Sequence, residues 1–276
     1  MKKYELEKNI VIYYDNQDNM GMSEKVIDFV WRNMDSDDSF ELVQETHKSK
    51  VFKLNSEANT FYIKYYTPLK IAKIIKNQFR EVEALRHYNT AMALQTAGIP
   101  TVLPVMAIVR KKNRLYKESI FVMEEVKGDT LERYVQKSRP VNIFRQETVK
   151  QLADIYAKLA NSYLLHQDPS FYNFVIREKY KDSLELVVID VDNIYKLPFF
   201  PEKAITFNLV KLYTMFSYDL NQLDLPPINK EDINYFINRF LERCNYSLDK
   251  SRLMDKVLKK SAQKLKPYGI EIESYL

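Results

Sequence analysis

The first half of the chain alternates short apolar stretches with polar turns, a pattern typical of β-strands. The alternation predicts strands at residues 10–14, 40–46, 51–54, 60–65, 105–109 and 119–124. Helical spacing of apolar residues covers residues 23–33 and then residues 68–96, a stretch long enough for one helix or two. Gly98 and Pro100 end that second stretch. We therefore expect a small unit in which five antiparallel strands have one main helix inserted between the third and the fourth.

Beyond Gly128 the chain becomes mostly helical. The apolar spacing predicts helices at residues 131–137, 143–165, 207–218, 230–244 and 251–266. One hairpin, formed by strands at residues 174–176 and 186–189, interrupts these helices. The expected fold class is α+β. Its expected parts are an N-terminal extension packed on the small lobe, the small lobe itself and a larger helical lobe, at residues 1–38, 39–124 and 125–276.

Composition narrows the class of protein. The 276 residues are 46% hydrophobic and 29% charged, as in a soluble globular protein. No run of eighteen apolar residues predicts a membrane span, and the basic start of the chain has no apolar stretch behind it, so we expect no secretory signal. Cys244 is the only cysteine, which excludes an internal disulfide framework and suits the cytoplasm. The net charge of +5 is compatible with anionic partners, but it is too small to indicate a nucleic-acid-binding protein.

The segment H-Q-D-P-S-F-Y-N contains the strongest candidate chemistry. It places Asp168 five residues before Asn173, and the strand V-V-I-D-V-D brings Asp190 one hairpin later. Metal-assisted phosphoryl transfer uses a carboxylate to orient the attacking hydroxyl, then an amide and a second carboxylate as oxygen ligands for Mg²⁺. Asp192 could be a further ligand or a structural anchor. His166 fits a buried scaffold position better than a base or a ligand.

Upstream residues extend this order of residue types. Lys64, in the strand F-Y-I-K-Y-Y, could reach nucleotide phosphates, and Lys53 is a weaker competitor. The next helix offers Glu81 as the ion-pair partner of that lysine, with Glu83 in reserve. Taken singly, each is more often a solvated lysine, a surface glutamate or a capping aspartate; the order strand-Lys, helix-Glu, D-x-x-x-x-N and strand-Asp favours a kinase. At the lobe boundary, we expect two further residues to contact the nucleotide: Glu124 and Val126.

With these residues in place, the chain resembles the lipopolysaccharide kinase family, the Kdo and heptose kinases of Gram-negative bacteria. The resemblance rests on the segments F-Y-I-K-Y-Y-T-P-L-K, R-E-V-E-A-L, A-G-I-P-T, H-Q-D-P-S-F-Y-N, V-V-I-D-V-D-N and F-N-L-V-K-L-Y. It implies a two-lobed protein-kinase-like fold, ATP as phosphate donor and a sugar hydroxyl, such as one of Kdo or heptose, as acceptor. It also implies that Lys64 and Glu81 anchor the phosphates, that Asp168 is the catalytic base, and that Asn173 and Asp190 hold the metal.

Some features depart from ordinary kinases. The loop E-T-H-K-S-K has no glycine, so its backbone cannot approach phosphates closely; side chains of residues 48–50 would have to donate instead. An atypical protein kinase, an aminoglycoside- or choline-type phosphotransferase and a pseudokinase binding module therefore stay as alternatives. Basic residues could rest on the anionic inner membrane surface or simply form a solvated basic face: Lys70, Lys73, Lys76, Arg80, Lys256, Lys259, Lys260, Lys264 and Lys266.

Overall fold

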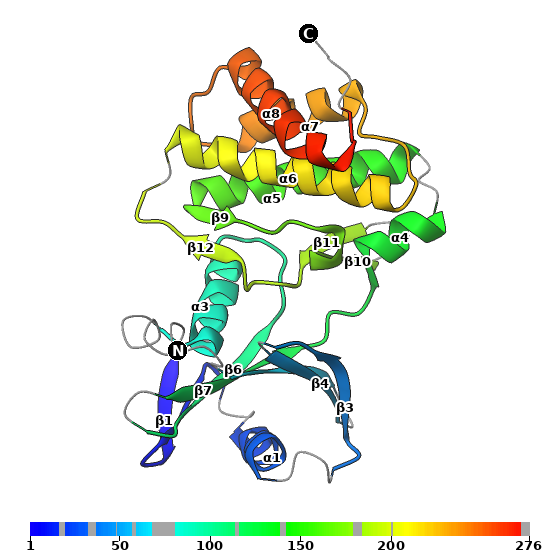
Figure 1. Ribbon diagram of the computed structural model, residues 1–276. Helices are drawn as coiled ribbons and strands as arrows, with labels where there is room; N and C mark the ends of the chain where they lie inside the picture. The colour runs from blue at the N-terminus through cyan, green and yellow to red at the C-terminus, as the bar shows by residue number, and fades with distance from the viewer. Residues whose placement is uncertain are drawn as a thin grey trace. The chain divides into compact units, whose positions relative to one another are not determined.

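The computed structural model divides the chain into two compact units, drawn in Figure 1. The first contains residues 1–93 and 102–125, and the second contains residues 94–101 and 126–276. The predicted division at residues 38 and 124 stays a prediction. The structure describes residues 1–16, 20–32, 37–47, 49–56, 59–67, 81–113, 116–138, 142–178, 184–199 and 201–271.

The first unit is built on a seven-stranded antiparallel sheet, so the predicted count of five strands was wrong. The two additional strands, β1 and β2, form a hairpin that pairs with β6, where Ile12 lies opposite Ile108. The β2 segment was predicted as a strand but not as part of this sheet. The β1 segment, K-K-Y-E-L-E, shows almost no apolar alternation because nearly all of its side chains are exposed. In sheet order the strands are β1 (Lys2–Glu7), β2 (Ile10–Tyr14), β6 (Pro104–Lys111), β7 (Lys117–Glu124), β5 (Thr60–Tyr66), β4 (Ser49–Asn55) and β3 (Phe40–Glu45).

Two helices pack on opposite faces of this sheet. Helix α1 (Met20–Trp31) buries Phe29 against Phe40, with ring centroids 3.8 Å apart, in a core that includes Ile63. Helix α3 (Glu83–Thr96) contacts the side chains that alternate with that core, because the Ala84 N–H donates to Ser119 Oγ on β7. The first part of the predicted helix at 68–96, with Lys70, Lys73, Lys76 and Arg80, lies outside the described residues.

The second unit is mostly helical, and all five predicted helices are present. Helix α5 ends four residues earlier than predicted because the chain turns into a short strand, β9 (Leu164–His166). Asn229 and Asp249 cap α7 and α8 by accepting hydrogen bonds from the N–H groups of Asp232 and Arg252. The helices are α4 (Leu131–Ser138), α5 (Asn142–Asn161), α6 (Glu202–Gln222), α7 (Lys230–Arg243) and α8 (Lys250–Leu265). Within the described residues, no helix is both long and apolar enough to cross a bilayer.

Two small sheets place the loops of the second unit. The predicted hairpin is formed by β10 (Phe174–Glu178) and β11 (Leu184–Val188), and a third strand, β8 (Asp129–Thr130), adds to β10. Strand β9 pairs with β12 (Ile194–Lys196). Gly128 sits where β8 approaches β10, at φ 144°, and a Cβ there would lie 2.2 Å from the Ile176 carbonyl oxygen. Only glycine fits this position.

Candidate active site

The segment that contains Asp168 follows β9, and α6 fixes that strand. Asn208 on α6 accepts a hydrogen bond from the His166 N–H at 2.8 Å and donates one to the Leu164 carbonyl at 3.1 Å. One buried amide side chain therefore bonds both ends of β9. These two hydrogen bonds fix the point at which the loop containing Asp168 begins.

Asn173 is the end of a short 3-10 turn, η2 (Phe171–Asn173), and its side chain closes the loop. Its Nδ2 donates to the Asp168 carbonyl oxygen at 2.6 Å. Its backbone carbonyl accepts from the N–H of Ile189, the residue before Asp190, at 3.0 Å. Because the amide nitrogen is used inside the loop, the amide oxygen of Asn173 is the atom that can bind a cation.

The turn after β11 is tied to the same loop. The Asn193 carbonyl accepts from the Gln167 N–H at 2.9 Å, and Asn193 Nδ2 lies 3.4 Å from Asp168 Oδ2. Asp190 Oδ1 accepts from the Asp192 N–H at 3.1 Å, which orients the Asp190 carboxylate. The structure thus brings together the segments that bear Asp168, Asn173 and Asp190.

The donor set fits Mg²⁺. Asn173 and Asp190 supply hard oxygen atoms, and Mg²⁺ commonly takes only one or two protein ligands together with waters and substrate phosphates. Among the described residues, no group of three or more His, Cys, Asp or Glu side chains could hold a metal ion by itself. Two protein oxygen ligands of this kind suit a metal that arrives with a nucleotide.

His166 is fully buried next to this loop. Burial lowers its pKa to about 4, although the charge of Asp190 acts in the opposite direction. The Tyr156 hydroxyl lies 3.4 Å from its Nδ1. A neutral, buried imidazole suits the scaffold position expected from the sequence.

Asp219 on α6 is a further loop residue that sequence reasoning missed. Its Oδ2 accepts a hydrogen bond from the Phe171 N–H at 2.7 Å, and the side chain is 7% exposed. Burial raises the pKa of Asp219 to about 6, and the negative charge of Asp168 acts in the same direction. No local signal marks Asp219, because it lies far along a helix whose spacing says nothing about the loop it touches.

In the first unit, Lys64 lies on the face of β5 that packs against α3. Tyr66, two residues on and therefore on the same face, has its hydroxyl 2.7 Å from His87 Nδ1 on α3. Phe121, directly opposite Lys64 on β7, also packs its ring against His87. His87 is four residues after Glu83, so both share one face of α3.

The two candidate glutamates differ in environment. Glu81 precedes α3 and is exposed, and its carboxylate accepts hydrogen bonds from Asn89 Nδ2 at 3.1 Å. Glu83 is the first residue of α3 and is 6% exposed. Lys53, the weaker competitor of Lys64, forms an ion pair with Glu125 at 3.1 Å.

The residues assigned to the lobe boundary belong to different units. Glu124 ends β7 and its N–H donates to the Leu103 carbonyl at 3.0 Å, so this amide is already used within the first unit. Val126 begins the main segment of the second unit. Their contact with a nucleotide stays a prediction.

A cavity of about 800 Å³, partly open to solvent, lies among the helices of the second unit. Aliphatic and aromatic side chains of α4, α5, α6 and α7 form most of its wall. Phe171, from the loop between Asp168 and Asn173, also lines it, and two carboxylates are among the lining residues: Asp224 and Asp232. A concave, mostly apolar pocket of this size is typical of small-molecule sites, so it is a candidate ligand site.

Comparisons with known proteins identify a family and a similar fold. The family model described as "Lipopolysaccharide kinase (Kdo/WaaP) family" matches residues 38–240. A solved structure titled "WaaP in complex with acyl carrier protein" superposes with a TM-score of 0.61 at 18% sequence identity, covering 82% of this chain and 88% of that one. A search of curated proteins gave no match.

Proposed function

Because the chain belongs to the lipopolysaccharide kinase (Kdo/WaaP) family, whose members are kinases that act on sugar hydroxyls, we propose that it phosphorylates a Kdo or heptose hydroxyl of the lipopolysaccharide core with ATP and Mg²⁺. The observation that carries this proposal is the closed loop in which Asn173 bonds both the Asp168 carbonyl and the residue before Asp190. Such a loop supports one carboxylate at an acceptor hydroxyl and two oxygen ligands at a metal.

In the proposed reaction, Asp168 accepts a hydrogen bond from the sugar hydroxyl and takes its proton as the oxygen attacks the terminal phosphorus of ATP. The bond between that phosphorus and the bridging oxygen breaks, and ADP leaves with the bridging oxygen. Asn173 and Asp190 would hold Mg²⁺, which supplies charge neutralisation at the phosphates. Lys64 binds phosphate oxygens through its ammonium group. The fixed loop orients Asp168 before the substrate arrives, which lowers the entropic cost of reaching the reactive geometry.

We assign the ion-pair partner of Lys64 to Glu83, the reserve candidate, in place of Glu81. Three observations support this assignment: Glu83 is buried, it shares a face of α3 with His87, and His87 contacts the residues that flank or oppose Lys64. A partly buried ion pair would hold the ammonium in place more firmly than one at the exposed Glu81 position. Glu83→Gln should therefore reduce turnover more than Glu81→Gln.

The test is a transfer assay with labelled ATP. The acceptor panel contains lipopolysaccharide precursors, free core sugars and generic proteins, and Asp168→Ala is the control. We expect label on the precursors and a loss of at least a hundredfold in the control. Label on protein would favour an atypical protein kinase, and label that persists in Asp168→Ala would contradict the role of Asp168.

A thermal-shift titration separates an active kinase from a pseudokinase. Mg-ATP should raise the melting temperature of the wild type but not of Asp190→Ala, since a ligand that binds only the folded state stabilises it by mass action. No shift at millimolar nucleotide would contradict nucleotide binding altogether. A shift without transfer to any acceptor would favour a binding module.

The apolar cavity favours a second ligand. We propose that it takes the aliphatic chain of an acyl carrier protein, supported by its apolar wall and by the similarity to WaaP, whose structure was solved with such a partner. Asp224 and Asp232 in the lining disfavour a free fatty-acid carboxylate and suit a neutral thioester. Acyl carrier protein with a long saturated chain should raise the melting temperature, whereas the unacylated carrier should not. Leu212→Trp, which fills the cavity, should remove the effect; an equal shift with both carriers would contradict this proposal.

A further inference from the structure

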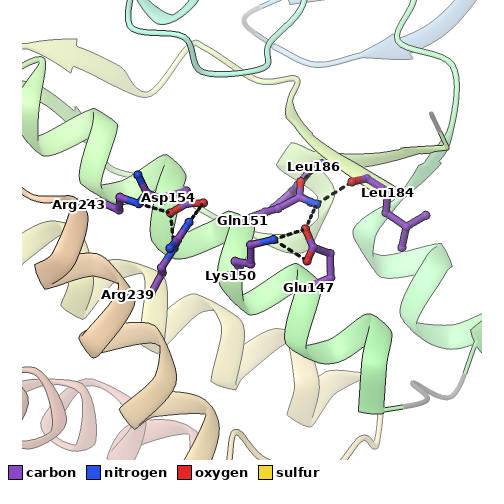
Figure 2. Close-up of polar contacts among 8 residues, drawn as sticks. All are labelled: Glu147, Lys150, Gln151, Asp154, Leu184, Leu186, Arg239 and Arg243. Carbon is purple, nitrogen blue, oxygen red and sulfur yellow. Dashed lines mark hydrogen bonds and ion pairs between the residues drawn. The ribbon is translucent and has the colours of Figure 1, made fainter. Parts of the chain in front are cut away.

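We propose that Gln151 on α5 is a positioning residue for Asp190, which it holds in place through β11. This inference rests on the proposed role of Asp190 in metal binding. Figure 2 shows the Gln151 side chain reaching from α5 to the backbone of β11. Its Nε2 donates to the Leu184 carbonyl at 2.6 Å, and its Oε1 accepts from the Leu186 N–H at 2.7 Å.

The side-chain amide of Gln151 makes the two hydrogen bonds that one residue of a neighbouring strand would make with β11. Strand β11 is the edge strand of its sheet, with β10 on one side only. A carbonyl and the N–H two residues later are the pair that a neighbouring strand would bond, and Gln151 bonds both at normal distances. The glutamine amide can donate from its nitrogen and accept at its oxygen at the same time, so one side chain makes both contacts.

The same edge of β11 is covered further along. The Val188 N–H donates to the Pro100 carbonyl at 2.9 Å, and Thr101 Oγ1 donates to the Val188 carbonyl at 2.8 Å. Helix α5 supports this second contact too, because Lys158 Nζ donates to the Gly98 carbonyl at 2.6 Å. Two side chains of α5 thus act on the strand that ends two residues before Asp190, one directly and one through the turn at residues 98–101.

The orientation of the Gln151 amide is determined by its neighbours. Nε2 also donates to Glu147 Oε1 at 3.1 Å, and Lys150 Nζ lies 3.0 Å from the other Glu147 oxygen. A flipped amide would place its oxygen against the Glu147 carboxylate and the Leu184 carbonyl. The nitrogen therefore points to the carbonyl and the oxygen to the N–H, as the strand requires.

The consequence concerns the metal more than the fold. Asp190 is four residues after Leu186, and the Ile189 N–H already bonds Asn173. Loss of the Gln151 contacts would free the start of β11 and allow the Asp190 carboxylate to sample more positions. Residues that orient a metal ligand typically change metal affinity by ten- to a hundredfold when replaced.

The experiment compares substitutions of two residues on the same helix, Gln151 and Asp154, both drawn in Figure 2. Gln151→Leu removes the contacts to β11. The control, Asp154→Asn, weakens the ion pair in which Arg239 Nε lies 2.8 Å from Asp154 Oδ1, which joins α5 to α7 away from β11. Thermal unfolding, hydrogen exchange of peptides covering residues 184–192 and Mn²⁺ binding in the presence of a non-hydrolysable ATP analogue are measured for both.

For Gln151→Leu we expect faster exchange at residues 184–192 and a dissociation constant for Mn²⁺ raised about tenfold. For Asp154→Asn we expect a change in melting temperature similar to that of Gln151→Leu, but unchanged exchange at residues 184–192 and unchanged Mn²⁺ affinity. Gln151→Glu, which keeps the acceptor but loses the donor, should be intermediate or worse because its added charge faces Glu147. Equal Mn²⁺ affinity in Gln151→Leu and wild type, with faster exchange, would overturn the positioning role. If wild type itself does not bind Mn²⁺ with the analogue, the proposed kinase function fails instead, and the exchange data still report on the strand.

Discussion

At the scale of single residues, two buried titratable groups with opposite pKa shifts flank the loop at residues 167–173. Burial lowers the pKa of His166 to about 4 and raises that of Asp219 to about 6. His166 therefore contributes stability above its ordinary pKa of about 6.5, and this contribution is lost as the pH falls towards 4. Asp219 behaves in the opposite way: its contribution is present below about pH 4 and is lost as the pH rises through 6. The two effects partly offset each other in the wild type.

Replacement of Asp219 should separate them. Asp219→Asn keeps an acceptor for the Phe171 N–H and removes the buried charge, so we expect it to be more stable than wild type at pH 7.5 by about 2 kcal/mol. The difference should shrink towards zero as the pH falls from 6 to 4, where the wild-type carboxyl is protonated. Urea unfolding across this range measures it. His166 is common to both proteins, so its titration cancels in the difference; a gap that does not change with pH would contradict the prediction.

The residues predicted from the sequence are those that one local segment specifies. Asp168 and Asn173 are five residues apart in one loop, and Asp190 follows a recognisable strand, so their spacing was readable. The burial of Glu83 could not be predicted from the sequence. Glu81 and Glu83 are only two residues apart, and which of them is buried depends on where α3 begins. Asp219 and Gln151 were missed for a related reason: each acts on a backbone segment remote in sequence, and helical periodicity does not identify that segment.

At the scale of elements, the approach of β8 to β10 depends on Gly128. A Cβ at this position would lie 2.2 Å from the Ile176 oxygen and 2.8 Å from Val175 Cγ1. Gly128→Ala should therefore lower the free energy of unfolding by about 2–4 kcal/mol, as chemical denaturation would measure. Gly21→Ala is the matched control: in α1 a Cβ would have no heavy atom within 4 Å, so a gain of up to about 1 kcal/mol is expected. Equal effects of the two substitutions would contradict the clash.

Most elements were predictable because their apolar spacing is local. The ends were less so. The predicted helix at 143–165 ran into β9, because Leu164 and Leu165 continue the apolar spacing while Tyr163 adopts a positive φ that ends the helix. The sheet gained β1 because pairing with β2, not apolar alternation, forms that strand.

At the scale of the whole molecule, the excess positive charge includes the exposed lysines of α8. We propose that this helix rests on anionic headgroups, although some of its lysines also have partners within the protein: Lys256 pairs with Glu202 at 2.6 Å. Replacement by Gln of Lys259 and Lys260 on α8, together with Lys266 directly after the helix, should weaken sedimentation with phosphatidylglycerol vesicles at least tenfold at low salt. Each lysine near such a surface contributes about 1 kcal/mol. A triple Gln replacement of Lys2, Lys3 and Lys8 has the same charge change and serves as control. Equal loss in both variants would indicate non-specific attraction.

The contacts that Gln151 and residues 100–101 make with β11 also affect the tendency of the folded protein to aggregate. Exposed backbone at the edge of a sheet invites a strand from another chain, and this association leads to aggregates. On β11 a glutamine and the segment at residues 100–101 already bond the outward-facing groups. The two edge strands of the large sheet, β1 and β3, are protected differently. Each takes part in an irregular pairing, and β1 begins with two lysines, which disfavour pairing with another chain. Substitution of Gln151 would therefore leave backbone groups at the edge of β11 unpaired, as well as loosen Asp190. We expect the variant to aggregate more than the wild type, increasingly so as the protein concentration rises.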